Sequence, residues 1–362
     1  MRLNSVNYNF FNNPFLNHEV NKKSDIPSDF AQAKLSFWGA TGAEGSKMRK
    51  GLRGLNCPCC GIKMLYNRDL NRALALPPDA PSKDVIAVLN NYKDNMHETE
   101  NNVFYMLKYL SKRYPKENLR QLLDKVRPRH LDMLLDEEKR VIGRIRAVGS
   151  FLNETEQEKL DNTLFEAEAF LKGDYDNVFA RRVFIGKIGD VTSNFEEKDI
   201  ADTIFEISHE LPRAGTSVSA FIVKFSQKNP KTGVERNSHD IIKGLLLPSM
   251  ATVEHVKARS PLAPNGGGEN KLSNYILECA RDNNMRECMP FRDFVKKHPK
   301  FFGQHLQRYI DAIIAKLNRG ELQGFENYPL QISRTLRRQT KGQIKLDISK
   351  LNSIKDKDKN IT

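Results

Sequence analysis

Apolar residues recur at helical spacing through a long central part of the chain. Val103, Met106, Leu107 and Leu110 fall at positions i, i+3, i+4 and i+7, which is the stripe of an amphipathic helix. Pro115 interrupts the stripe, which then resumes and continues to about residue 150. Further helices are expected at 154–172, 177–186, 197–208 and 240–247. The pattern therefore predicts a mainly helical segment, with a boundary near Pro77-Pro78.

Within the helix expected at 154–172, Leu160, Leu164, Phe165 and Ala167 are expected to face inward. A second kind of pattern lies further along. The stretch 217–225 is β-like at its end, 249–256 is a strand candidate, and another short strand opens at Asn274. Beyond it, 304–317 again has one apolar face and is predicted to be a helix.

Composition changes this picture in two ways. The 362 residues carry a formal net charge of +13, which favours a polyanionic partner such as nucleic acid. There are five cysteines, three of them within four positions, which indicates a reducing compartment with a metal site rather than a disulfide framework. No apolar run approaches the ~18 residues needed to span a membrane, and the first residues lack the apolar core of a signal peptide. We therefore expect a cytoplasmic protein.

Side chains suited to phosphodiester chemistry gather between residues 252 and 286. Glu254 and His255 stand side by side at the end of the predicted strand, and three glycines at 266–268 follow. A histidine is a suitable general base near neutral pH, and carboxylate and amide oxygens are ligands for hard divalent cations. Because neighbouring residues of a strand point to opposite faces, Glu254 and His255 can share one site only where the strand ends or bends.

The order of these residues resembles the HNH, or ββα-metal, nuclease family. The resemblance rests on Glu254-His255, on Asn274-Tyr-Ile-Leu-Glu-Cys279 and on Asn283, nine positions after Asn274. It implies that His255 is the general base and that Glu254 and Asn283 hold a catalytic divalent cation such as Mg²⁺. It also implies that Asn274 braces the loop. Glu254 is one methylene longer than the aspartate common in the family.

Basic residues surround the motif. Arg286 matches a basic position of the family one turn after Asn283, which implies a contact with phosphate. Lys257 and Arg259 flank His255 and are further candidates for nucleic-acid binding. DNA is the expected substrate.

The cysteines form a second constellation. Cys57 and Cys60 are separated by two residues, a spacing that lets both thiolates reach one tetrahedral zinc. The resemblance implies a second pair, for which the chain offers Cys279 and Asp282. The expected zinc ligands are therefore Cys57, Cys60, Cys279 and Asp282, with Cys288 or Cys59 as alternative fourth ligands. A redox pair, free thiols without metal and simple core residues remain as alternative interpretations.

Together these features predict an α+β, mainly helical fold in which a ββα-metal HNH module is split by a long helical insertion. The expected parts are an extension (1–33), a cysteine knuckle (34–78), the insertion (79–247), the HNH core with its following helix (248–333) and a basic flexible tail (334–362). The insertion's four histidines, His97, His130, His209 and His239, have no ligand-like spacing and are interpreted as surface or core residues.

The expected function is a metal-dependent HNH endonuclease with a structural Zn²⁺. The alternative is a catalytically inactive, zinc-stabilised protein that binds nucleic acid or acts as a scaffold. The insertion is open to binding a protein partner or to self-association.

Overall fold

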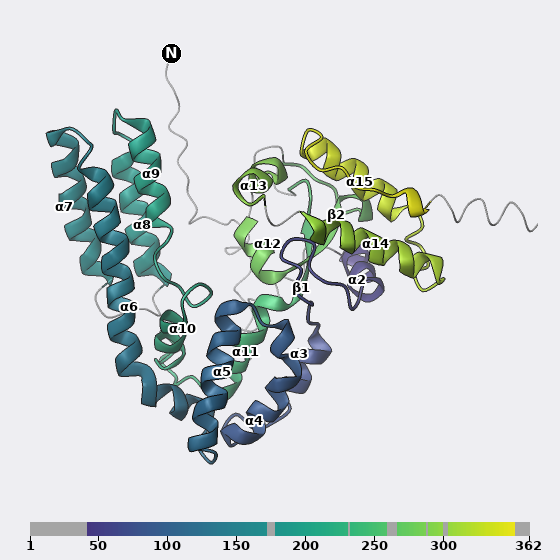
Figure 1. The fold of residues 1–362 in the computed structure, drawn as a ribbon, viewed down its shortest axis with the longest axis horizontal. Coiled ribbons are helices and arrows are strands. Elements are labelled where there is room, and N and C mark those ends of the chain that lie inside the picture. Colours follow the sequence, from purple (N-terminus) through teal and green to yellow (C-terminus); the bar gives the residue numbers. More distant parts are fainter. Residues whose placement is uncertain are drawn as a thin grey trace, which may run out of the picture. The chain divides into compact units, whose positions relative to one another are not determined.

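The computed structural model describes residues 42–171, 178–230, 232–258, 266–286, 289–299 and 303–351 (Figure 1). The extension expected at 1–33 lies outside these residues. Helices dominate the described part of the chain, which contains one two-stranded sheet. The predicted class, α+β and mainly helical, is confirmed.

The cysteine knuckle is a tight turn between two helices, α2 (Gly42–Gly51) and α3 (Asn67–Ala73). Within it, the amide of Cys57 donates to the carbonyl of Ile62 at 2.7 Å, and the amide of Gly61 donates to the carbonyl of Cys57 at 2.9 Å. Gly61 has a φ of +76°, a conformation that glycine adopts without strain.

The knuckle then joins the sheet. Leu65 forms a parallel bridge with Met250: its amide donates to the carbonyl of Ser249, and its carbonyl accepts from the amide of Ala251. Two segments far apart in the sequence are thereby held side by side by backbone hydrogen bonds.

The central segment is helical, as its periodicity predicts. Pro115 follows the end of α5, and Asn118 caps α6 by accepting from the amide of Gln121, the capping-box arrangement. The elements are α4 (Ser82–Leu89), η2 (Asn90–Asn95), α5 (Glu98–Arg113), α6 (Leu119–Gly149), α7 (Glu154–Leu171), α8 (Val178–Thr192), α9 (Lys198–Ser208), α10 (Val218–Phe225), α11 (Ser238–Leu246) and η3 (Leu247–Ser249).

Two local predictions in this segment are wrong. Phe165 is 79% exposed, because Leu160, Leu164 and Ala167 already occupy the buried face of α7 and Phe165 lies ~100° around the helix from Leu164. The stretch 217–225 is α10, not a strand. Its side chains from 219 to 223 are all buried, so burial erases the periodicity that would distinguish a helix from a strand.

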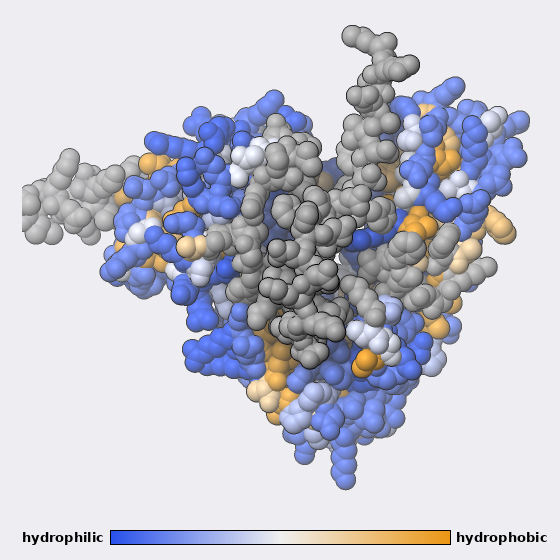
Figure 2. All heavy atoms as spheres, turned by 180° about the vertical axis from the view of Figure 1, so that it is seen from behind, coloured by the Kyte–Doolittle hydropathy of each residue, from blue (hydrophilic) through white to orange (hydrophobic). Residues whose placement is uncertain are grey.

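Among the apolar clusters of the described residues, two are large. One combines residues from 48–66 with residues from 251–279 and 291–344. The other is built from residues between 141 and 211 on α6 to α9. The knuckle therefore shares its core with the second half of the chain. Among the coloured residues of Figure 2, most of the visible surface is hydrophilic, with smaller hydrophobic areas. No described helix is long and apolar enough to cross a membrane.

The sheet and the helix after it form a compact ββα unit. Strand β1 (Ala251–His255) pairs antiparallel with β2 (Tyr275–Cys279), with Ala251 opposite Cys279 and His255 opposite Tyr275. The short turn η4 (Leu272–Asn274) leads into β2, and α12 (Ala280–Arg286) follows β2 directly. The order of these elements along the chain is β1, η4, β2 and α12.

The chain continues through α13 (Phe291–Lys297), α14 (Gln304–Asn318) and α15 (Tyr328–Gln339). The expectation of a flexible tail from residue 334 is wrong up to residue 351, because position 334 lies within α15. Thr335, Leu336 and Ile344 are buried, so the high charge of this region hides an amphipathic helix whose arginines occupy only the outer face. Residues 352–362 lie outside the described residues.

Candidate metal centre and the adjoining ββα site

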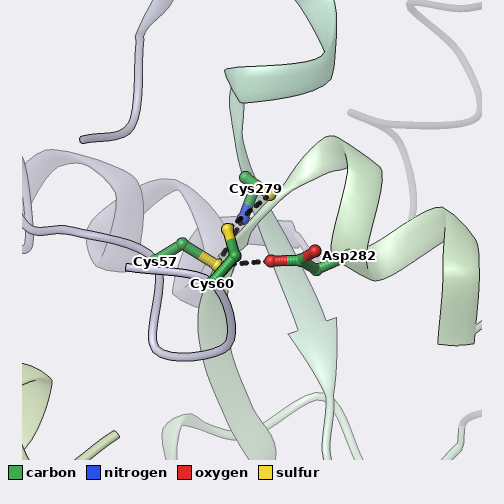
Figure 3. A group of neighbouring side chains, drawn as sticks. All are labelled: Cys57, Cys60, Cys279 and Asp282. Atoms are coloured by element: carbon green, nitrogen blue, oxygen red, sulfur yellow. Dashed lines mark hydrogen bonds between the residues drawn. The ribbon is translucent and has the colours of Figure 1, made fainter. Parts of the chain in front are cut away.

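Four side chains converge where the knuckle meets the end of β2. The sulfur atoms of Cys57, Cys60 and Cys279 and a carboxylate oxygen of Asp282 all lie within 4.8 Å of one another (Figure 3). Cys57 and Cys60 come from the knuckle turn, and Cys279 and Asp282 come from the junction of β2 and α12. These are the four residues expected from the sequence, and the group can hold a metal ion.

The spacing within the group suits tetrahedral coordination. Cys60 Sγ and Cys279 Sγ are 3.8 Å apart, and two thiolates on one zinc at Zn–S distances of ~2.3 Å lie ~3.8 Å apart. Cys57 Sγ lies 3.0 Å from Asp282 Oδ2 and accepts the backbone N–H of Cys279 at 3.4 Å. This amide is a donor that stabilises a negatively charged sulfur.

The electrostatics of the group also suit a cation. Burial opposes ionisation of Cys57, yet its hydrogen bonds, led by the one with Cys279, hold the pKa of this thiol well below its usual value. Burial and then the neighbouring Cys57 raise the pKa of Asp282 to about 7. Several acidic groups therefore compete for charge in one buried place, and a bound cation would relieve that competition.

Of the two alternative fourth ligands, Cys59 is fully buried but is not a member of the group. Burial raises the pKa of its thiol well above the usual value. Cys288 lies outside the described residues. Glu278, on β2, is also fully buried, and neither of its carboxylate oxygens has a hydrogen-bond partner within ordinary distance. Burial and then Cys57 raise the pKa of this carboxyl.

Sequence reasoning missed His97, which precedes α5. Its Nε2 lies 3.6 Å from Cys279 Sγ. Burial, followed by the nearby Arg281, lowers the pKa of His97 to about 4. An ion pair nearby holds the same two segments together: Arg281 on α12 donates to both carboxylate oxygens of Glu100 on α5 at 2.5 Å. No local spacing marks His97, since its proximity depends entirely on how α5 packs against α12.

Glu254 points toward α12, where it forms an ion pair with Arg286. The Arg286 side chain is fully buried. It also donates to the carbonyl of His255 at 2.6 Å and to the carbonyl of Met289 at 2.8 Å. Arg286, the candidate for a phosphate contact, is thus placed inside the unit, where it joins the end of β1 to α12.

His255 lies on the other face of β1. Its Nε2 is 2.9 Å from the Oδ1 atom of Asn270, and its ring contacts Tyr275 edge to face at a centroid distance of 4.8 Å. Glu254 and His255 therefore follow the strand's alternation, and the two side chains leave β1 in opposite directions.

Asn274 closes the loop that follows β1. Its Oδ1 accepts from the amide of Lys257 at 2.8 Å, and its Nδ2 donates to the carbonyls of Lys257 and Glu269 at 3.0 and 3.1 Å. The amide side chain thus takes the place of a backbone partner for both ends of the loop. Of the two basic residues near His255, Lys257 belongs to this loop and Arg259 lies outside the described residues.

Asn283 is on α12 and donates from Nδ2 to the hydroxyl of Thr252 at 3.0 Å. Thr252 and Glu254 lie on the same face of β1, two residues apart. Asn283 and Arg286, three residues apart, share one face of α12. Asn283 and Glu254 therefore face the same space between β1 and α12, each with its own partner there.

No protein-family model, no curated protein and no solved structure matches this chain. Any function for this site must therefore be argued from its own residues.

Proposed function

We propose that the protein is a metal-dependent nuclease of the ββα-metal type that hydrolyses phosphodiester bonds in nucleic acid, with DNA as the first substrate to test. The observation that carries the proposal is the ββα unit itself. In it, β1 ends at Glu254-His255, Asn274 braces the loop, and α12 places Asn283 opposite β1.

His255 has the surroundings of a general base. With the Asn270 amide oxygen accepting from Nε2–H, the ring takes the tautomer in which Nδ1 carries the lone pair. Nδ1 is then the atom that would take the proton from an attacking water. Tyr275 holds the ring plane by its edge-to-face contact, so the base is fixed in orientation before substrate binds.

Glu254 and Asn283 are the oxygen donors proposed to hold the divalent cation. Because Asn283 donates from Nδ2 to Thr252, its amide is fixed with Oδ1 as the remaining acceptor. Glu254 shares its carboxylate with Arg286, so the cation and Arg286 would occupy neighbouring positions on it. A bound Mg²⁺ supplies charge stabilisation at the scissile phosphate.

The Cys57, Cys60, Cys279 and Asp282 group is proposed to hold a structural Zn²⁺. Three thiolates are the donors that zinc prefers in closed structural sites. The ion would join the knuckle to the first turn of α12, and so would fix the helix that carries Asn283.

A basic hollow offers a surface for the substrate. Ser273 of η4 lines it together with four residues of α15: Gln331, Arg334, Thr335 and Arg338. Its volume is about 340 Å³. Arg334 and Arg338 are exposed, and none of the ion pairs found within the described ranges involves them. Because Ser273 precedes Asn274, a phosphate seated there would lie beside the loop that His255 begins.

The decisive experiment measures cleavage of supercoiled plasmid, single-stranded DNA and RNA by the full chain, with Mg²⁺, with Mn²⁺ and with chelator. Cleavage should require the added cation, and His255→Ala should lower the rate by at least about 100-fold. His298→Ala, which changes a histidine outside the ββα unit, is the matched control. Equal cleavage by His255→Ala and the parent protein would refute the assignment of the base.

A zinc-stabilised nucleic-acid-binding protein without catalysis is the second candidate. It is favoured by two observations: Glu254 and Asn283 are each engaged by another side chain, Arg286 and Thr252, and the side chains of Glu254 and His255 leave β1 in opposite directions. In the same assay it would bind the nucleic acids, with or without Mg²⁺, and leave them uncut.

A further inference from the structure

His97 approaches the metal centre from a part of the chain that supplies none of its other donors. Its Nε2 is 3.6 Å from Cys279 Sγ. For an imidazole and a thiolate on one tetrahedral zinc, with bonds of ~2.0 and ~2.3 Å, the nitrogen and sulfur lie ~3.5 Å apart. The observed separation therefore fits two ligands of one ion.

The second ring contact of His97 supports the same role. The backbone carbonyl of Pro248, just before β1, acts on the ring and opposes the fall in its pKa. A histidine that donates from Nδ1 to this carbonyl presents the Nε2 lone pair to Cys279. This is the tautomer that metal-binding histidines use, with the far nitrogen oriented by a backbone carbonyl.

The position of His97 is also firmly held. It is the N-cap of α5, and one turn later Glu100, which is 1% exposed, receives Arg281 of α12. Arg281 lies between the two donors Cys279 and Asp282 in the sequence. The first turn of α5 is thus attached to the same short segment that carries half of the metal-binding group.

We infer that His97 is a ligand of the structural metal ion and takes, beside Cys57, Cys60 and Cys279, the fourth position that the proposed function gives to Asp282. This inference rests on the zinc centre of the proposed function and is independent of nuclease activity. It requires a small inward shift of the imidazole, since His97 is outside the set of groups that lie within 4.8 Å of one another.

Two physical arguments favour imidazole over carboxylate in this position. Imidazole and thiolate match the borderline-soft character of zinc better than a carboxylate oxygen does. In addition, a set of three thiolates and a carboxylate carries one more negative charge than a set of three thiolates and an imidazole. In a centre where Cys57, Cys279 and Asp282 are buried, the less charged set has the smaller desolvation cost.

The functional consequence is that the helical segment becomes part of the metal centre. With His97 as ligand, the ion would bind three separate stretches of chain: the knuckle, the start of α5 and the junction of β2 with α12. Loss of the metal would then loosen α5 as well as the knuckle.

The test is zinc K-edge X-ray absorption of the full chain carrying one equivalent of zinc. The inference predicts three sulfur ligands, one nitrogen ligand and the outer-shell scattering of one imidazole. His97→Ala should lose the imidazole signal and weaken zinc binding at least tenfold, whereas Asp282→Asn should keep both. His130→Ala is the matched control, because the His130 imidazole contacts Ser219 rather than the metal-binding group. Its zinc spectrum and zinc affinity should match those of the parent.

Each other outcome overturns the inference. A parent spectrum with sulfur and oxygen but no imidazole would assign the fourth position to Asp282. A weaker affinity in His97→Ala, without any imidazole signal in the parent, would make His97 only a hydrogen-bond partner of Cys279. A parent protein that retains no zinc would remove the zinc centre as well, while leaving the cleavage assay to decide the nuclease proposal. Because the parent spectrum alone distinguishes these cases, misfolding of a variant does not prevent a decision.

Discussion

Gly268 lies directly against the backbone of Lys257, so closely that a Cβ at position 268 would overlap the Lys257 carbonyl oxygen and crowd Asn274 Nδ2. The two residues stand at opposite ends of the loop that leaves β1. The contact explains why the loop needs glycine at this position: the backbone of residue 268 lies against the backbone of Lys257 with no room for a side chain between them.

Gly268→Ala should therefore lower the free energy of unfolding by about 1–3 kcal/mol, because the overlapping oxygen belongs to the backbone and cannot rotate away. Urea denaturation measures the change. Gly186→Ala is the matched control, since a Cβ there meets nothing within 4 Å and helix α8 should gain up to about 1 kcal/mol. Equal stability of the two variants would show that the loop is not packed as described.

The buried pair of Glu100 and Arg281 provides a test of how α5 is attached. Glu100→Ala should destabilise the protein by about 2–4 kcal/mol, because it leaves the Arg281 guanidinium, which is 20% exposed, without its partner. A double-mutant cycle with Arg281→Met should recover part of the loss. Glu210→Gln, which affects an exposed pair with Arg144, should cause no measurable change. If the double-mutant cycle shows no coupling energy between Glu100 and Arg281, α5 is not attached to α12 through this ion pair.

Removal of the metal should destabilise the protein and should do so through particular cysteines. Cys57→Ser and Cys60→Ser should each abolish stoichiometric zinc binding and lower the unfolding temperature as strongly as chelation does. Cys59→Ala changes a cysteine in the same turn that is outside the group, and this variant should keep one zinc per chain by elemental analysis. Zinc loss in Cys59→Ala would assign a ligand role to Cys59.

Arg334 and Arg338 should contribute to nucleic-acid binding through charge. Arg334→Gln with Arg338→Gln should weaken binding to duplex DNA and reduce the salt slope of log K by about 2, as expected for two lost phosphate contacts. Fluorescence anisotropy at several salt concentrations gives both quantities. Arg319→Gln, which removes a cation already paired with Glu321, should leave the slope unchanged. An unaltered slope in the double variant would exclude this hollow from the binding surface.

His130 should make stability depend on pH. Burial, and then the neighbouring Arg129, lowers the pKa of His130 in the folded state below the usual histidine value of about 6.5. As the pH falls below this value, the unfolded chain takes up a proton that the folded chain resists, so stability falls. His130→Gln should remove this part of the loss between pH 7 and 5, whereas its stability at pH 8 should stay close to that of the parent. Parallel pH profiles for the two proteins would contradict this.

The sequence predicted those parts of the structure whose signals are local. Helix α14 has clear helical periodicity, and the two-residue spacing of Cys57 and Cys60 is a local signal for a metal-binding turn. Cys279 and Asp282 lie more than 200 residues further along the chain, and they were added to the group through the resemblance to a family motif rather than through local spacing.

Other features depend on tertiary packing and could not be read in this way. In helix α10, residues 219–223 are buried on successive sides of the helix, so apolar positions there do not follow a helical period. Helix α15 was not predicted because its arginines suggested a charged, unstructured tail. These arginines lie on the exposed face of the helix, whereas Leu336 is buried on the opposite face. His97 meets Cys279 across 182 positions of sequence, and the inward turn of Arg286 toward Glu254 is likewise a matter of packing.

The separation of Cys60 from Cys279 by 219 residues has a consequence for synthesis. A ribosome adding ~5–20 residues per second exposes the knuckle's thiols for ~10–40 seconds before Cys279 appears. During that interval the intervening helices can begin to fold, because their contacts are local, while Cys57 and Cys60 are still without Cys279. In the proposed zinc centre, completion of the donor set is therefore a late step, and the thiols of the knuckle are exposed to oxidation until then.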